Sequence, residues 1–175
     1  MKNTLMLLGI LGFSLMGFSQ VTDNDKEAKE VKLEEVTVTP IVNFSYQNLV
    51  REDTTPDYVQ NLQDEVARYD VTQDPNFNGD YEAYEVIFSQ TNGRIIATYD
   101  QDGKVISTFE KFKNVTPPES VRNSIYELYP NWTIHKDIYR VTYFQGEDVK
   151  KIYQLQVRKD NQKKNIKVDT KGNIL

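Results

Sequence analysis

The sequence predicts an α+β fold in which helices pack on one face of an antiparallel sheet. Two helix starts, at Pro56 and Pro118, are each followed by runs in which apolar and polar residues alternate. Alternation with a period of two is typical of strands with one buried face, and proline suits the first turn of a helix. The order of helix and then strands occurs twice. We therefore expect one globular domain over residues 55–175, built of tandem units at 55–113 and 114–175.

The first unit opens with a helix at Thr55-Pro56-Asp57, where the Thr55 hydroxyl is placed to accept a bond from a free N–H group. Apolar residues follow on one helical stripe: Val59, Leu62, Val66 and Tyr69. Three alternating runs come next, and the turn residues between them predict a meander. These runs contain Tyr84, Val86 and Phe88; Ile95, Ala97 and Tyr99; and Val105, Ser107 and Phe109.

The second unit has the same order. Its helix starts at Pro117-Pro118-Glu119 and stops at Pro130, with Val121, Ile125, Leu128 and Tyr129 on one stripe. Strands are predicted at residues 132–144, 150–158 and 164–169 and from residue 173 onward. The helix residues expected to face the sheet are Leu62, Val66, Ile125 and Leu128.

Residues 84–106 align without gaps on residues 153–175 after a shift of 69 positions. Identities include Asp100 with Asp169 and Gly103 with Gly172. In a turn, an aspartate can accept bonds from backbone N–H groups and a glycine can adopt positive φ. We therefore expect the same hairpin to be built twice, with positive φ at both glycines. The residues before the turns, Tyr99 and Val168, should then lie on the helix-covered face.

The first 19 residues have the features of a signal peptide. Lys2 precedes an apolar run of 14 residues, and Gly17-Phe18-Ser19 supplies the small residues that signal peptidase requires before Gln20. A permanent membrane helix takes about 20 residues, so we expect cleavage and no membrane anchor. The chain is thus predicted to be exported, either periplasmic or secreted. It has no cysteine, so its stability must come from packing.

Residues 20–54 are predicted to form a flexible leader followed by an extended arm. The charged composition of residues 20–35 cannot bury much apolar surface, whereas residues 36–39 and 41–44 are β-branched and alternating. Residues 34–40 resemble the short segment near the N-terminus of TonB-dependent receptors, which adds as a strand to a partner's sheet. A linker or edge strand is the alternative interpretation, and we favour it.

Several motifs resemble one family of exported bacterial proteins. They are Tyr126-Glu127-Leu128-Tyr129-Pro130, then Trp132-Thr133-Ile134, then Tyr153-Gln154-Leu155, and the closing segment from Val168 to Leu175. In this order they resemble the PepSY-like, β-lactamase-inhibitor-like (BLIP-like) domain, in two tandem units over residues 56–175. The resemblance implies helices on one face of an antiparallel sheet and a role in binding or inhibiting other extracytoplasmic proteins. It brings no catalytic residues.

The residues offer little enzyme chemistry. Nucleophilic catalysis needs a nucleophile with a base in reach, but the chain has no cysteine and one histidine, His135, in an expected strand. A zinc site needs three or four ligands, and the isolated glycines cannot cradle a phosphate. The oxygen-rich loop at residues 70–80 could hold calcium, although it lacks the EF-hand order and a solvated loop is favoured. We therefore expect no enzyme activity, no metal and no cofactor.

The sequence favours a binding or inhibitory module that acts on an unidentified extracytoplasmic protein or envelope ligand. The alternatives are a structural or folding-assistance role in the cell envelope and, remotely, carboxylate-based enzyme chemistry. The formal net charge is −5 and no large basic patch is evident along the chain, so nucleic acid is not expected as a partner. The oligomeric state stays open. The candidate binding face is the sheet face without helices, where we expect Tyr81, Ile87, Ile96, Ile106, Ile138 and Ile152, together with Gln154.

Overall fold

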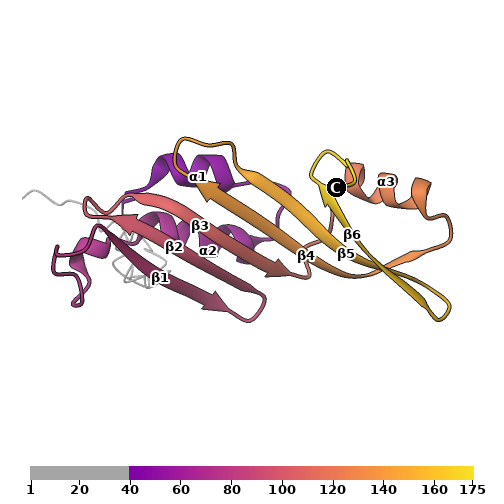
Figure 1. Cartoon of the computed structure of the whole chain (residues 1–175), viewed down its shortest axis with the longest axis horizontal. Helices are drawn as coiled ribbons and strands as arrows, with labels where there is room; N and C mark the ends of the chain where they lie inside the picture. Colours follow the sequence, from indigo (N-terminus) through magenta and orange to yellow (C-terminus); the bar gives the residue numbers. More distant parts are fainter. Residues whose placement is uncertain (1–39) are drawn as a thin grey trace, which may run out of the picture. The chain divides into compact units, whose positions relative to one another are not determined.

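A computed structural model describes residues 40–175 of the chain (Figure 1). The predicted signal peptide, the predicted flexible leader and the residues expected to be extended at 36–39 lie outside this range. Six strands form one antiparallel sheet, in which each strand pairs with the next along the chain. They are β1 (Ala83–Gln90), β2 (Gly93–Asp100), β3 (Val105–Lys113), β4 (Thr133–Phe144), β5 (Lys150–Lys159) and β6 (Gln162–Asp169).

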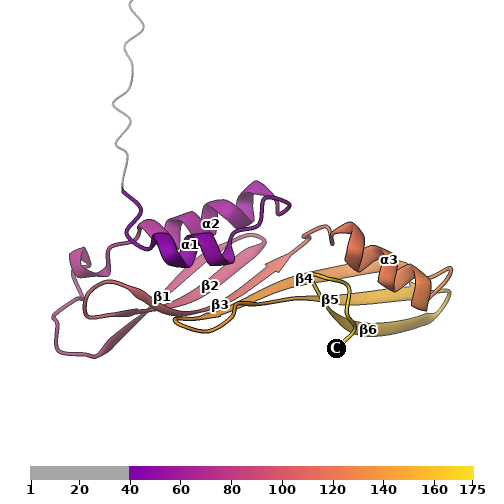
Figure 2. The ribbon, with the colours of Figure 1, turned by 90° about the horizontal axis from the view of Figure 1, so that it is seen from above.

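Within residues 40–175, three α-helices cover a single face of this sheet (Figure 2). They are α1 (Phe44–Val50), α2 (Asp57–Arg68) and α3 (Glu119–Leu128), and a short 3-10 helix, η1 (Val71–Gln73), follows α2. The predicted α+β class is therefore confirmed. Between residues 40 and 175, no helix is both long enough and apolar enough to span a bilayer.

The core lies between the helices and the sheet and is rich in tyrosine. The expected stripe of α2 is confirmed, since Val59, Leu62 and Val66 are all buried. Tyrosine can fill such a core when its hydroxyl finds a partner, and the Tyr99 hydroxyl donates to the Val66 carbonyl at 2.9 Å. The largest buried side chains from the sheet are Ile95, Tyr99, Phe112, Tyr139, Tyr153 and Leu155.

The prediction of an extended arm at residues 41–44 is wrong, because this segment leads directly into α1. Tyr46 and Val50, four residues apart on one face of α1, are buried. Asn43 anchors the start of the helix: its side-chain amide donates to the Gly103 carbonyl at 3.1 Å and accepts from the Val105 N–H at 2.8 Å. The β-branched residues ahead of Asn43 suggested a strand, but burial of Tyr46 and Val50 favours the helix.

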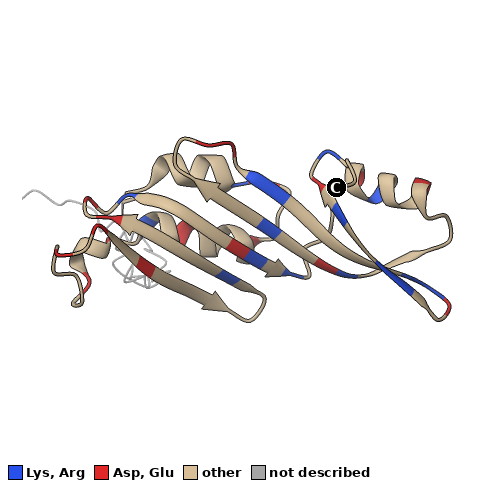
Figure 3. Ribbon diagram, viewed as in Figure 1, with Lys and Arg blue, Asp and Glu red and all other residues tan. Residues whose placement is uncertain are grey.

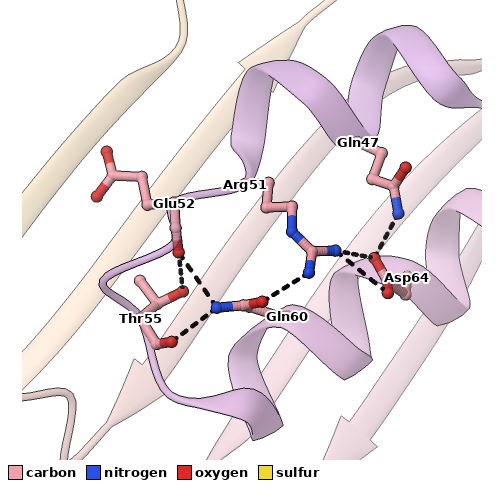
Figure 4. A network of polar contacts seen from close by, with 6 residues as sticks. All are labelled: Gln47, Arg51, Glu52, Thr55, Gln60 and Asp64. Carbon is pink, nitrogen blue, oxygen red and sulfur yellow. Dashed lines mark hydrogen bonds and ion pairs between the residues drawn. The ribbon is translucent and has the colours of Figure 1, made fainter.

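Polar side chains join α1 to α2 (Figure 4). The Asp64 carboxylate accepts from the Gln47 amide at 2.5 Å and pairs with the Arg51 guanidinium at 3.1 Å. The Thr55 hydroxyl donates to the Glu52 carbonyl at 2.7 Å, so it does not cap α2 as predicted. The helix begins at Asp57, one residue later than predicted, with Pro56 in the N-cap position.

The duplicated turn is confirmed. Gly103 and Gly172 have φ values of 75° and 94°. The Asp100 carboxylate accepts from the N–H groups two and four residues ahead at 3.0 and 2.8 Å, and the Asp169 carboxylate does the same at 2.9 and 2.8 Å. The preceding residues, Tyr99 and Val168, are both buried among the core residues. A shift of 69 positions also superimposes the bounds of β2 on those of β6.

One helix prediction is wrong. Ile125 in α3 is buried, but Leu128 is 52% exposed although it lies on the same stripe. The helix ends at Leu128, and Tyr129 leaves the helical conformation with φ −128° and ψ 69°. The Tyr129 ring then packs against Trp132 at 5.8 Å, and both rings lie beneath the Lys164 ammonium. These rings contact the core, whereas Leu128 does not.

Candidate functional site

The face of the sheet opposite the helices is the candidate site. Five of the isoleucine and glutamine residues predicted for this face alternate with core residues on their strands: Ile87, Ile96, Ile138, Ile152 and Gln154. Side chains alternate across a strand, so these five point away from the helices. Ile87 and Ile96 are direct cross-strand partners. The face thus brings together predicted side chains from β1, β2, β4 and β5.

Tyr81 does not belong to this face, which corrects the prediction. It precedes β1, and its ring lies 6.0 Å from the ring of Tyr84. Tyr84 pairs with Tyr99 and shares its helix-side orientation. The alternation that assigned Tyr81 to the open face does not extend beyond the start of the strand.

A β-bulge in β3 decides which residues of this strand face outward. Thr98 pairs with Ser107 but Tyr99 pairs with Val105, so Ile106 has no partner on β2. Val105 and Thr108 are both buried, which leaves Ile106 and Ser107 on the open face together. Phe109 then also faces outward. The sequence pattern grouped Phe109 with Val105, and the extra residue of the bulge separates them.

Four side chains form an exposed apolar cluster on the open face: Ile87, Ile96, Phe109 and Phe144. Ile96 pairs with Ile87 on one side and with Phe109 on the other. The Phe109 ring meets the Phe144 ring edge to face, with centroids 5.6 Å apart. Ile87, Phe109 and Phe144 are 50%, 51% and 38% exposed. Single exposed apolar residues are ordinary, but a contiguous group marks an interaction surface.

A cationic row runs beside the apolar cluster. Arg94 of β2 pairs with Lys111 of β3, which in turn pairs with Arg140 of β4. All three side chains are exposed. Within residues 40–175 the salt bridges are Arg51 with Asp64 and Lys151 with Glu52, so the row has no counter-ion there. In Figure 3 the lysine and arginine segments, drawn in blue, occur on neighbouring strands of the sheet.

The row is not visible in the sequence because its members are far apart in the chain. The densest basic group along the chain is around Lys163 and Lys164, and Lys164 turns toward the Tyr129 and Trp132 rings. Cross-strand register, not sequence proximity, gathers the row. The sequence does show that cations alternate with core residues, since Arg94 precedes Ile95 and Lys111 precedes Phe112. Only the strand pairing shows that these cations are neighbours.

The cationic row and two residues of the apolar cluster, Ile96 and Phe109, line a shallow hollow of about 330 Å³ on the open face. Its outward-facing walls are Arg94, Ile96, Phe109, Lys111, Arg140 and Thr142. A second hollow of about 360 Å³ lies toward β6. It includes the predicted residues Ile138 and Gln154, with Lys136 and Lys167 beside them. The hollows offer apolar and cationic contacts but no nucleophile paired with a base.

The helix side of β3 holds a buried carboxylate. Glu110 is 2% exposed, and its oxygens accept from the Tyr46 hydroxyl at 2.8 Å, the Gln63 amide at 2.8 Å and the Thr108 hydroxyl at 3.0 Å. Burial raises the pKa of Glu110, and these three hydrogen bonds and the charge of Lys151 oppose the rise. Because the carboxylate is enclosed between α1, α2 and the sheet, it serves packing and is out of reach of a substrate.

Other residues considered for chemistry have ordinary surroundings. His135 is exposed at a register shift in β4. In the loop at residues 70–80, Asp70 accepts from the Thr72 N–H at 3.0 Å and Asp74 accepts from the Asn76 N–H at 2.8 Å. Asp74 also accepts from the Tyr69 hydroxyl, which raises the pKa of Tyr69 to about 12. Among the described residues, no group of three or more histidines or carboxylates could hold a metal ion.

Comparison with known proteins adds little to this geometry. No protein-family profile and no curated protein matches the chain. Among solved structures, the chain is similar to a DUF2874 family protein from Bacteroides ovatus ATCC 8483. The two are 20% identical, the match covers 71% of this chain and 86% of that chain, and the TM-score is 0.34. A likeness at this level carries no information about function.

Proposed function

We propose that this chain is an exported, non-enzymatic binding or inhibitory module whose helix-free sheet face contacts another extracytoplasmic protein. The observation that carries the proposal is the contiguous apolar cluster around Phe109. Its members lie on four neighbouring strands and are held by the sheet register. Aromatic side chains at the centre of a patch, with arginine at its rim, are typical of protein interfaces.

The rigidity of the sheet supports the same proposal. Each residue of the cluster sits on a strand paired on one or both sides, so the cluster is preorganised for a partner. The buried helix side of the sheet fixes the register, since a slip by one residue would turn the core outward. The predicted signal peptide and the resemblance to PepSY-like domains are consistent with an extracytoplasmic partner, and both belong to the proposal.

Site-specific photo-crosslinking in the source cells tests this function. A photoreactive phenylalanine analogue replaces Phe109 in one variant and Tyr126 of α3 in a matched control. Both side chains are aromatic and comparably exposed, at 51% and 46%, but Tyr126 lies on a helix. We expect a discrete crosslinked protein from position 109 and none from position 126. Equal products at both positions, or none at position 109, would show that the open face is not the binding surface.

A further inference from the structure

The cationic row places like charges side by side, and the described part of the chain supplies no ion pair that would stabilise them. Arg94, Lys111 and Arg140 are direct neighbours across three strands, which lie about 4.8 Å apart in a sheet. Like charges directly opposite each other destabilise a sheet. No carboxylate within residues 40–175 pairs with any of the three. An anionic group bound between them would remove this repulsion.

The apolar cluster lies immediately beside the row. Ile96 follows Arg94 by two residues on β2, and Phe109 precedes Lys111 by two residues on β3. Ile96 and Phe109 therefore lie about 7 Å from the cationic row along the strands. Both line the same hollow. A ligand that fills this hollow therefore meets cations on one side and apolar side chains on the other.

The distribution of acids limits the size of that ligand. Exposed acidic residues gather at the Phe144 end of the sheet. Asp102, Glu147 and Asp148 lie in turns beyond Phe144, and Glu85 of β1 lies level with Phe144 across the strands. Figure 3 shows acidic residues in the turn between β4 and β5 and in the loop ahead of β1. A broad anionic surface, such as a bilayer or a duplex, would approach these acids together with the cationic row. A short anionic segment can bind the row and avoid them.

We infer that the open face recognises an acidic protein segment, whose carboxylates bind Arg94, Lys111 and Arg140 while its apolar side chains pack on Ile96 and Phe109. This inference rests on the proposed function and names the chemistry of the partner. Arginine forms bidentate hydrogen bonds with carboxylates, and two of the three cations are arginines. Charge complementarity of this kind also speeds association and excludes cationic partners.

Fluorescence anisotropy with a defined probe tests the inference. The probe is a fluorescein-labelled peptide of four Glu-Glu-Leu repeats, and its control has glutamine in place of every glutamate. We expect the purified protein to bind the glutamate peptide, and to bind it more weakly as salt screens the charges. The R94Q/K111Q/R140Q variant should bind about tenfold more weakly or worse.

A matched variant removes three exposed cations elsewhere: K159Q/K163Q/K171Q. It should bind the glutamate peptide within about twofold of the wild-type protein, since these lysines lie outside the row. F109A should also weaken binding. Neither triple variant should lower the temperature of unfolding. The row variant should keep its stability because neutralising the row removes like-charge repulsion. A folded row variant that binds as tightly as the wild-type protein would overturn the inference.

Two further outcomes would also overturn it. One is equal affinity for the glutamine peptide. The other is tighter binding, at the same salt, to vesicles of phosphatidylcholine with phosphatidylglycerol or to duplex DNA. The crosslink at Phe109 reports separately on the proposed function. If the crosslink forms while the row variant binds the glutamate peptide normally, the proposed binding face is supported and the inference of an acidic partner is refuted.

Discussion

Replacing the buried Glu110 by alanine should lower the free energy of unfolding by about 3 to 5 kcal/mol. The three donors that point at this carboxylate come from Tyr46, Gln63 and Thr108, and all three residues are buried. Without an acceptor, each donor loses its bond in a place that water does not reach, at about 1 to 3 kcal/mol each. Removal of a buried charge offsets part of this loss. Urea unfolding measures the difference.

The isosteric variant E110Q separates the hydrogen bonds from the charge. Its amide oxygen can still accept from Tyr46 and Thr108. Oε1 of Gln63 is buried with no hydrogen-bond partner among the described residues, so a flip of the Gln63 amide lets it accept from the introduced NH₂ group. We expect E110Q to unfold within about 1 kcal/mol of the wild-type protein. A loss below about 1 kcal/mol for E110A, or a larger loss for E110Q, would refute this account of the network.

The same pair of proteins should differ in pH dependence. Burial raises the pKa of Glu110 in the folded chain above its value in the unfolded chain. Its favourable contribution is therefore fully present below the unfolded pKa and is lost as pH rises through the folded pKa. The stability of E110Q relative to the wild-type protein should be greatest near neutral pH and should fall on acidification. A difference that does not change with pH would contradict the raised pKa.

The remaining predictions concern α3, the paired turns and export. Ile125→Ala should lower the free energy of unfolding by about 2 to 5 kcal/mol, and Leu128→Ala by less than about 0.5 kcal/mol, because only Ile125 is buried. Gly172→Ala should lower the unfolding temperature more than Gly103→Ala: both have positive φ, but a Cβ at 172 would lie 2.5 Å from an atom of α3, whereas the nearest atom at 103 is 3.5 Å away. N-terminal sequencing of exported protein should start at Gln20, and an uncleaved N-terminus would contradict the signal peptide.

Features with a local cause were predictable from the sequence. Pro56 and Pro118 mark the starts of α2 and α3 because proline fits a helix start and nowhere later in the helix. The turns at Asp100 and Asp169 were predictable because an aspartate and a glycine three residues later satisfy the turn without help from the rest of the fold. Strand positions followed from alternation, which reflects burial of one face.

Features set by distant contacts were not predictable. The helix α1 forms because Tyr46 and Val50 find a place over the sheet and α2, and nothing near them in the sequence signals this. Leu128 fits the helical stripe, but the chain leaves the helix at Tyr129, whose ring packs with Trp132. The cationic row exists only once the register of β2, β3 and β4 is known.

The bulge at Ile106 determines the character of both faces of β3. Regular alternation from Val105 would place Ser107 and Phe109 inside and would turn Glu110 outward. Its carboxylate would then lie among the outward cations of the neighbouring strands and neutralise part of their charge. With the bulge, Glu110 pairs with Ile95 and Val141 on the helix side, and Phe109 and Lys111 face outward. A chain with a net charge of −5 therefore presents a cationic row because register turns the acidic residue of its central strand inward.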